Sequence, residues 1–382
     1  MKIFMRICIG CLLVTTQAAM SAEKDALVYP DAEWHKATPD NQGIDSQKMH
    51  RALRAFHQQS GGVGSDEMVI IRNGRLIWEG PNADNVHEIY SCTKTFTSTV
   101  MGLLVTSNHI FEDDYAVQYL PTLDDNFHDY NKITLHQLAT MTAGYAGIMG
   151  SGWEFYNTDR ALHYRYVQTY TMPGSPDFEA GSTMRYRDPQ VHLLGYILTK
   201  VAGNSLENIF TNRVAYRIGM KHFKWTNYGY RDGMFFNNPA GTPDDGQGGV
   251  HSSARDLARY GLLYLSGGEW NGEKILAPAF VHRATSNQVP ADLDPDYFLC
   301  GRYGYYWWTN DVRADGARPM PSAPPGTYLA HGAGRNFIII VPEWNMVIVR
   351  LSPAPGGDIS VGQCSEQILN TFLAQLGESI QQ

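Results

Sequence analysis

The sequence is poor in cysteine, in clustered basic residues and in long apolar runs. Five cysteines occur in 382 residues, and 30 Lys and Arg stand against 38 Asp and Glu, for a formal net charge of −8. A mildly acidic chain without a basic cluster has no electrostatic reason to bind nucleic acid. After the first residues, no apolar stretch approaches the roughly 20 residues that a membrane helix needs. We therefore expect no nucleic-acid partner and no stable insertion into a membrane.

Metal-binding spacings are missing as well. After its first residues, the sequence contains no Cys-x-x-Cys and no His-Glu-x-x-His, the spacings that place ligands around a zinc ion. We expect no dedicated metal site. Beyond the first residues only Cys92, Cys300 and Cys364 remain, so at most one disulfide can form within the chain. Cys300 and Cys364 either pair or stay free, and Cys364 falls on the apolar face of a predicted C-terminal helix.

The first residues have the pattern of a secretory signal peptide. A short basic segment precedes an apolar run over 7–14, and Ala19-Met20-Ser21 resembles a small-x-small cleavage site. The apolar run is too short to span a bilayer. The pattern predicts that residues 1–22 are removed and that the mature protein is periplasmic or secreted. Cys11 could also serve as a lipoprotein attachment site, which is the less favoured alternative.

Periodicity and turn signals divide the rest of the chain into strands and helices. Asn73-Gly74 between two apolar runs is a strong hairpin signal, because both residues tolerate positive φ. A second hairpin is predicted over 336–351, and a β-forming segment over 302–309. Helical spacing of apolar residues predicts helices over 44–59, with Ser46 as its cap, over 91–105, 133–141, 189–201 and 252–265, and at the C-terminus.

The order of these elements predicts the fold class. Strands lie near both ends of the chain, helices fill the middle, and hairpins form antiparallel pairs. We expect an α/β (α+β) sandwich in which an antiparallel β-sheet from both chain ends is flanked by helices, with an inserted, mainly helical lobe. The predicted sheet domain comprises residues 23–124 and 244–382, and the predicted lobe comprises 125–243.

The segment Ser91-Cys92-Thr93-Lys94 opens one of the predicted helices. A spacing of three places Ser91 and Lys94 on one helical face. A serine hydroxyl becomes a good nucleophile when a base takes its proton. Lysine can be that base only if burial or a nearby cation lowers its pKa. The positive end of the helix favours developing negative charge. The alternative is a helix N-cap followed by a solvated lysine.

Two further segments give this motif a context. Tyr186-Arg187-Asp188 runs into a predicted helix, and His331-Gly332-Ala333-Gly334 runs into the closing hairpin. With Ser91-x-x-Lys94, they resemble the motifs of the serine β-lactamases of class C, the DD-peptidases and their esterase and amidase relatives. The resemblance covers roughly residues 43–376.

Supporting segments strengthen the resemblance. Residues 133–144 and 248–257 look like the same family. Residues 330–334, with Val341-Pro342-Glu343 after them, look most like the 6-aminohexanoate-dimer hydrolase and esterase members. The resemblance implies a fold of the β-lactamase/transpeptidase type, with the site between the sheet and the helical lobe.

The resemblance also implies a role for each site residue. Ser91 would be the acylated nucleophile, Lys94 its base or proton relay, and Tyr186 the group that moves the proton between Ser91 and the leaving group. A tyrosine, with an ordinary pKa of about 10, needs a nearby cation for this task, and Lys94 supplies one. The oxyanion hole would use the backbone N–H of Ser91 and one N–H near Ala333 or Gly334. No metal or organic cofactor is implied.

Two residues depart from the family pattern. Asp188 stands where many members have asparagine, and with Pro189 after it, it also has the pattern of a helix N-cap; the two roles can coexist. His331 replaces a lysine that helps β-lactamases hold a substrate carboxylate, and a mostly neutral imidazole does this less well. The alternative for His331 is a buried strand histidine. Together with residues 332–334, both are predicted to contact the substrate. We expect Cys92 to be buried and to point away from the nucleophile.

These observations predict an exported serine hydrolase that acts on a small ester, amide or peptide-like substrate. Two alternatives stay open. The first is a β-lactamase or DD-carboxypeptidase, which turnover of nitrocefin would distinguish. The second is a penicillin-binding or sensing module with little turnover, against which the presence of serine, lysine and tyrosine together argues.

Overall fold

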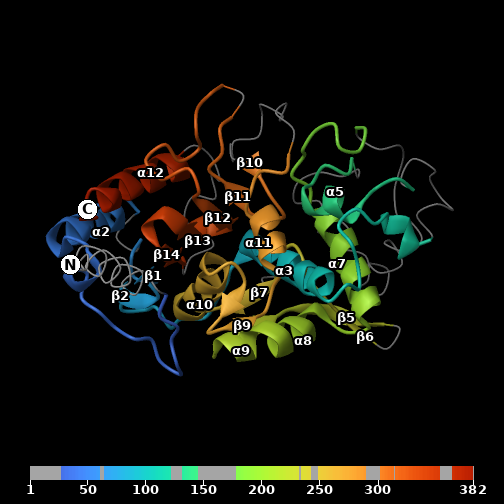
Figure 1. Ribbon diagram of the computed structural model, residues 1–382, viewed down its shortest axis with the longest axis horizontal. Helices are drawn as coiled ribbons and strands as arrows, with labels where there is room; N and C mark the ends of the chain where they lie inside the picture. Colours follow the sequence, from blue (N-terminus) through green and yellow to red (C-terminus); the bar gives the residue numbers. More distant parts are fainter. Residues whose placement is uncertain are drawn as a thin grey trace, which may run out of the picture.

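The computed structural model describes most of the chain as an α/β protein (Figure 1). The described residues are 27–60, 64–121, 131–144, 178–231, 234–241, 248–289, 302–313, 315–352 and 364–381. The predicted signal peptide and Cys300 lie outside them, as does the side chain of Cys364. Whether the two cysteines pair therefore stays a prediction.

A seven-stranded antiparallel sheet forms the centre of the molecule, and it joins the two ends of the described chain. Its strands, in spatial order, are β10 (Arg302–Tyr303), β11 (Trp308–Thr309), β12 (Tyr328–Gly332), β13 (Asn336–Val341), β14 (Met346–Arg350), β1 (Met68–Arg72) and β2 (Arg75–Glu79). The early hairpin β1–β2 thus lies beside the late hairpin β13–β14. This pairing confirms the predicted antiparallel sheet built from both chain ends.

Short strands form three smaller sheets among the described residues. The first has the order β3 (His87–Glu88), β7 (Val250–Ser252) and β4 (Phe223–Trp225); the others pair β5 (Asn227–Arg231) with β6 (Met234–Asn237), and β8 (Glu269–Trp270) with β9 (Glu273–Lys274). The β3–β7 pairing connects the segment before Ser91 to residues far along the chain. The domain boundaries at 124 and 244 stay a prediction.

Helices surround the sheets. They are α2 (Ser46–Gln59), α3 (Thr93–Thr106), α5 (Leu135–Ala139), α7 (Asp188–Ala202), α8 (Leu206–Phe210), α9 (Tyr216–Ile218), α10 (Ala254–Leu265), α11 (Pro278–Ala284) and α12 (Cys364–Gly377). Single turns occur at η1 (Asp40–Gln42), η2 (Tyr90–Cys92), η3 (Ala116–Gln118), η7 (Ala333–Arg335) and η8 (Pro342–Trp344), and η6 (Thr211–Ala215) is a π-helical turn. None of the described helices is both long and apolar enough to cross a membrane.

The local sequence explains where several elements begin and end. Asn73 (φ 52°) and Gly74 (φ 76°) form the predicted β1–β2 turn in left-handed geometry. Helix α2 is capped by Asp45, which accepts from the backbone N–H of Lys48 at 2.9 Å, so the expectation that Ser46 caps it is wrong. The predicted helix over 133–141 is only the short α5. Its capping box starts it late, and a left-handed Met141 (φ 58°) follows its end.

Helix α10 covers one face of the large sheet, and α2 and α12 lie side by side (Figure 1). A Cβ on Gly261 would lie 2.5 Å from a Val347 methyl group, so glycine lets α10 pack directly on β14. Phe56 of α2 contacts Phe372 of α12 with 4.9 Å between ring centroids. Helix α3 is buried along nearly all of its length, which is typical of a central helix.

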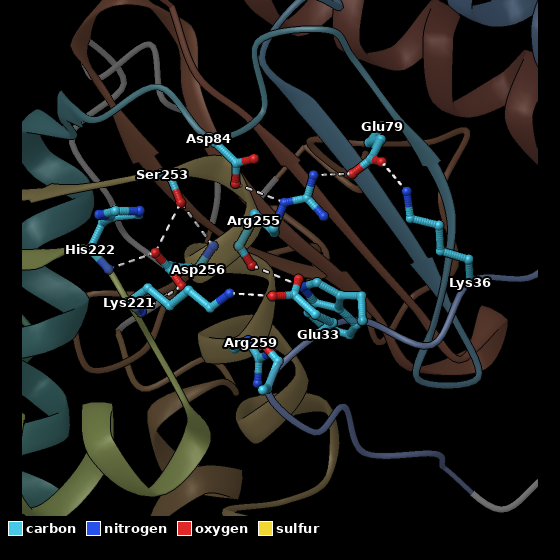
Figure 2. A network of polar contacts seen from close by, with 12 residues as sticks. Glu33, Lys36, Glu79, Asp84, Lys221, His222, Ser253, Arg255, Asp256 and Arg259 are labelled. Atoms are coloured by element: carbon cyan, nitrogen blue, oxygen red, sulfur yellow. Dashed lines mark hydrogen bonds and ion pairs between the residues drawn. The ribbon is translucent and has the colours of Figure 1, made fainter.

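Ion pairs join α10 to β2, and hydrogen bonds attach the N-terminal segment to α10; Figure 2 shows the ion pairs. Arg255 contacts the carboxylates of Glu79 at 2.6 Å and Asp84 at 2.8 Å. The buried Arg259, on the same helix, donates to the backbone carbonyl of Asp31 at 2.8 Å. Because a buried arginine needs acceptors for its N–H groups, these contacts stabilise the attachment of this segment.

Candidate active site

The predicted nucleophile lies in a constrained turn at the start of α3. Ser91 is in η2, directly before the helix, and Tyr90 has the unusual φ of 48°. A Cβ on Gly241 would lie 1.9 Å from the Tyr90 carbonyl oxygen, so the neighbouring backbone packs tightly against the turn. The backbone of the Ser91 turn is therefore held from both sides, since β12 contacts it as well.

Cys92 is buried against β13, as predicted. Its thiol lies 3.4 Å from the Asn336 carbonyl oxygen. Burial raises the pKa of the Cys92 thiol above its ordinary value. The thiol is therefore neutral near pH 7, which leaves Ser91 as the candidate nucleophile of these two neighbours.

Lys94 lies at the centre of a group of buried polar atoms. Its Nζ lies 2.9 Å from Ser91 Oγ, 2.9 Å from Asp188 Oδ1 and 2.7 Å from the Ala240 carbonyl oxygen. The side chain is 1% exposed. The Tyr186 hydroxyl is a further hydrogen-bond partner of Lys94. These acceptors are at least as many as the three protons of an ammonium group, so the surroundings suit a charged lysine.

The pKa of Lys94 is raised above its ordinary value. Burial by itself lowers it, but the negative charge of Asp188 and the contact with Tyr186 outweigh burial. The sequence argument required a lowered pKa if Lys94 is to take the Ser91 proton. In the resting site the pKa of Lys94 is raised instead. The physical reason is Asp188, whose carboxylate stabilises the ammonium form.

Tyr186 lies over the same group and is almost completely buried. Its ring stacks on Trp308 with 5.7 Å between centroids, and Lys94 Nζ lies 4.9 Å from the ring centre. Burial raises the pKa of the Tyr186 hydroxyl. The charge of Lys94 lowers this pKa, the charge of Asp188 raises it, and hydrogen bonds with Lys94 and Ser91 lower it; the net shift is upward. Tyr186 is therefore a neutral phenol near pH 7, in contact with both Ser91 and Lys94.

The start of α7 places Asp188 beside Lys94 in this group. The residue at the cap position is Arg187, and Asp188 is the first residue of the helix. Asp188 therefore does not occupy the cap position of α7, and the prediction that it caps this helix is wrong. The carboxylate, 7% exposed, pairs with Lys94, since a buried carboxylate is stabilised by an opposite charge.

The end of β12 lies directly beside the Ser91 turn. A Cβ on Gly332 would lie 2.2 Å from the Ile89 carbonyl oxygen and 3.2 Å from the Cys92 nitrogen, so only glycine fits. His331 stacks on Phe337 with 4.8 Å between ring centroids. Burial lowers the pKa of His331 to about 4, and the imidazole is neutral near pH 7. The next residues, Ala333 and Gly334, form the turn to β13.

The structure thus brings Ser91, Lys94, Tyr186 and Asp188 together and places β12 beside them. Sequence reasoning missed Ala240, whose carbonyl accepts from Lys94. The Asn238-Pro239 pair is a turn signal, but it does not indicate which side chain the turn would contact. Asn238 Oδ1 accepts from the Ala240 and Gly241 N–H groups at 3.1 and 3.0 Å and so shapes this turn. Within the part of the chain that the structure describes, no group of three His, Cys, Asp or Glu side chains could hold a metal ion.

Comparison with known proteins identifies relatives of this chain. The Beta-lactamase family model matches residues 49–369. A β-lactamase of Pseudomonas fluorescens is 30% identical over 139 residues, 36% of each chain. A 6-aminohexanoate-dimer hydrolase of Paenarthrobacter ureafaciens is 21% identical over 340 residues, which is 84% of this chain and 81% of the relative.

Similar solved structures extend the comparison to the fold. A putative β-lactamase from Bacteroides dorei superimposes with a TM-score of 0.65 at 16% identity, over 86% of this chain and 98% of that one. At this identity the likeness concerns the fold alone. The chain spans between 36% and 61% of the length of the first three curated β-lactamases that it matches.

Proposed function

Because the chain belongs to the Beta-lactamase family, we propose that it is a serine hydrolase that cleaves ester or amide bonds through an acyl-enzyme on Ser91. One observation carries the proposal: at the start of α3, Ser91 forms a single hydrogen-bonded group with the buried Lys94 and Tyr186. A serine hydroxyl held between a cation and a phenol can lose its proton as it attacks a carbonyl carbon.

The protonation states suggest how the proton moves. Lys94 donates to Ser91 Oγ, so the serine proton is left for the Tyr186 oxygen. As Ser91 attacks the carbonyl, its proton passes to Tyr186, and the phenol proton passes to the leaving oxygen or nitrogen. Water then attacks the acyl-enzyme along the reverse path, returning a proton to Ser91. Tyr186 gains one proton and gives up another in this transfer, so it stays neutral, and Lys94 stays an ammonium that stabilises the partial negative charge on the Ser91 oxygen as its proton leaves.

Asp188 is the residue that keeps Lys94 in this charged state. Their side chains form an ion pair with Nζ and Oδ1 2.9 Å apart. The group formed by Ser91, Lys94, Tyr186 and Asp188 then has no net charge, and His331 adds none near pH 7. This balance favours neutral esters and amides over substrates that carry a carboxylate beside the scissile bond.

Covalent labelling of the nucleophile tests the proposal. A fluorophosphonate probe should label the purified protein, and a nitrophenyl butyrate ester should be hydrolysed. Both reactions should be lost in Ser91→Ala, with an unchanged circular dichroism spectrum. A folded Ser91→Ala protein that still hydrolyses the ester at the wild-type rate would contradict the proposal. Labelling of the wild type without turnover would favour the sensing module instead.

A further inference from the structure

The turn between β12 and β13 has an unusual backbone. Gly334 (φ 74°) and Arg335 (φ 63°) are both left-handed, and the second is not a glycine. Such a conformation costs a non-glycine residue on the order of 1 kcal/mol and persists only where the surroundings impose it. The turn begins at Gly332, which touches the backbone around Ser91. The contacts that impose this conformation therefore also determine the backbone at the edge of the proposed active site.

Arg350 binds the outer side of this turn. It is the last residue of β14, 4% exposed, and its Nη1 donates to the carbonyl oxygens of Gly334 at 2.8 Å and Arg335 at 2.7 Å. Its Nε donates to the Gly64 carbonyl at 3.2 Å, which holds the guanidinium plane. Burial lowers the pKa of Arg350 to about 10, so the side chain stays charged near pH 7.

Asn336 binds the backbone carbonyl that comes directly before these two in the chain, that of Ala333. Its side chain is fully buried, and Nδ2 donates to the Ala333 carbonyl oxygen at 2.8 Å. Its Oδ1 accepts from the Ser352 N–H at 3.0 Å, which sets the orientation of the amide. Three consecutive carbonyls, those of Ala333, Gly334 and Arg335, are thus bound by donors of two buried side chains.

Because the peptide bond is planar, these contacts also determine the direction of the neighbouring N–H groups. In a trans peptide, the C=O of one residue and the N–H of the next point in opposite directions, and the described chain contains no cis peptide bond. Because the carbonyls of Ala333 and Gly334 point to Asn336 and Arg350, the N–H groups of Gly334 and Arg335 point away from these side chains. Successive N–H groups in such a turn form a concavity that suits an anion.

We propose that Asn336 and Arg350 are positioning residues for the Gly334 N–H as the second donor of the oxyanion hole, opposite the Ser91 N–H. Asn336 holds the Ala333 carbonyl of the same peptide, and Arg350 holds the next two carbonyls and with them the left-handed conformation of the turn. The inference rests on the proposed serine hydrolase activity. It also selects Gly334 from the two candidate donors left open by the sequence. Neither side chain needs to touch the substrate, because both act through the carbonyls that they hold.

The experiment compares Arg350→Met with a matched control, Arg259→Met. Arg259, labelled in Figure 2, is also a buried arginine that donates to backbone carbonyls, but these belong to Ile218 and to the N-terminal segment. Loss of one oxyanion donor typically lowers kcat about 100-fold or more. We expect this loss for Arg350→Met on nitrophenyl butyrate, with little change in KM. Arg259→Met should lower Tm and leave kcat near the wild-type value.

A transition-state analogue gives a readout that a merely structural role would not move. A phenylboronic acid forms a tetrahedral adduct with a serine nucleophile, so its affinity should fall in Arg350→Met by a factor similar to kcat. Arg350→Lys, which keeps a charged donor, should recover part of both. Asn336→Leu removes the donor to Ala333 at nearly constant shape and repeats the test if Arg350→Met does not fold.

The outcomes separate the two proposals. A wild-type protein that neither reacts with the fluorophosphonate nor hydrolyses the ester overturns the hydrolase assignment and this inference with it. An active wild type, with folded Arg350→Met or Asn336→Leu that keeps kcat and boronate affinity within threefold, overturns the inference alone. Equal losses in Arg350→Met and Arg259→Met would also overturn it, because they would indicate a general effect of stability.

Discussion

Replacing Asp188 by asparagine tests the charge state assigned to the proposed catalytic group. The amide has almost the same shape as the carboxylate but no charge, so it leaves the Lys94 ammonium buried without its partner. Nζ and Oδ1 are 2.9 Å apart, with side chains 1% and 7% exposed. At an effective dielectric constant of about 20, Coulomb attraction at this distance is about 6 kcal/mol, part of which is cancelled by desolvation. Removing one partner of a buried pair typically costs about 3–5 kcal/mol.

The sign of the pH dependence follows from the pKa of Lys94. In the wild type this pKa is raised, so the stabilisation from the pair is fully present below the pKa of an unfolded lysine, about 10.4. It is lost only as the pH rises through the still higher folded value. In Asp188→Asn, burial dominates and the folded pKa falls below the unfolded one. The free energy of unfolding of the variant should therefore rise toward the wild-type value between pH 7 and pH 10.

Urea unfolding and ester hydrolysis from pH 6 to pH 10 measure both consequences. If Lys94 must be charged, Asp188→Asn should lose activity on the alkaline side at a lower pH than the wild type. Asp256→Asn is the matched control. Asp256 is also a buried carboxylate, but it accepts from backbone N–H groups and Ser253 in the network of Figure 2. The control should lose stability without a shift of the activity profile. Higher activity of Asp188→Asn than of the wild type at pH 7 would refute the reasoning, since Lys94 would then act as a neutral base.

Four further predictions follow from the same site and from the sequence. Lys94→Ala and Tyr186→Phe should each lower kcat by orders of magnitude, and the double variant should be little worse than either, because residues of one proton-transfer unit are not additive; fully multiplicative losses would make Tyr186 structural. Gly332→Ala should lower kcat at least tenfold, because its Cβ would lie 2.2 Å from the Ile89 carbonyl oxygen; wild-type kinetics would show that β12 can move away freely. Nitrocefin should be a poorer substrate than nitrophenyl butyrate by kcat/KM, and a tenfold preference for nitrocefin that disappears in Arg335→Ala would show that Arg335 supplies the missing cation. N-terminal sequencing of periplasmic protein should find a start near Ala22 or Glu23, and an intact first methionine in a cytosolic fraction would refute export.

Local signals in the sequence were sufficient for much of the fold. Asn73-Gly74 defined the β1–β2 turn, because few other pairs accept two left-handed residues. Apolar spacing over 252–265 predicted α10, and the structure shows that the Ser253 side chain caps it by accepting from the Asp256 N–H. Signals of this kind act within a few residues, so the sequence alone contains them. The predicted helix over 133–141 was wrong at both ends. The local capping box of Thr134 and Gln137 starts it later, and Met141, whose carbonyl accepts from the distant Arg185 N–H, has left-handed geometry.

The sequence by itself determined which residue types the site contains: a serine and a lysine at a spacing of three, a tyrosine before a helix, and a small-residue strand end. Only the tertiary structure decided their chemical state. Asp188 lies 94 positions after Lys94 and Ala240 lies 146 positions after it, and both contacts depend on how α3, α7 and the following turn pack together. The same holds for Arg350 and the β12–β13 turn. Because the pKa of a buried group depends on which charges surround it, the state of Lys94 as a cation could not be obtained from its local sequence.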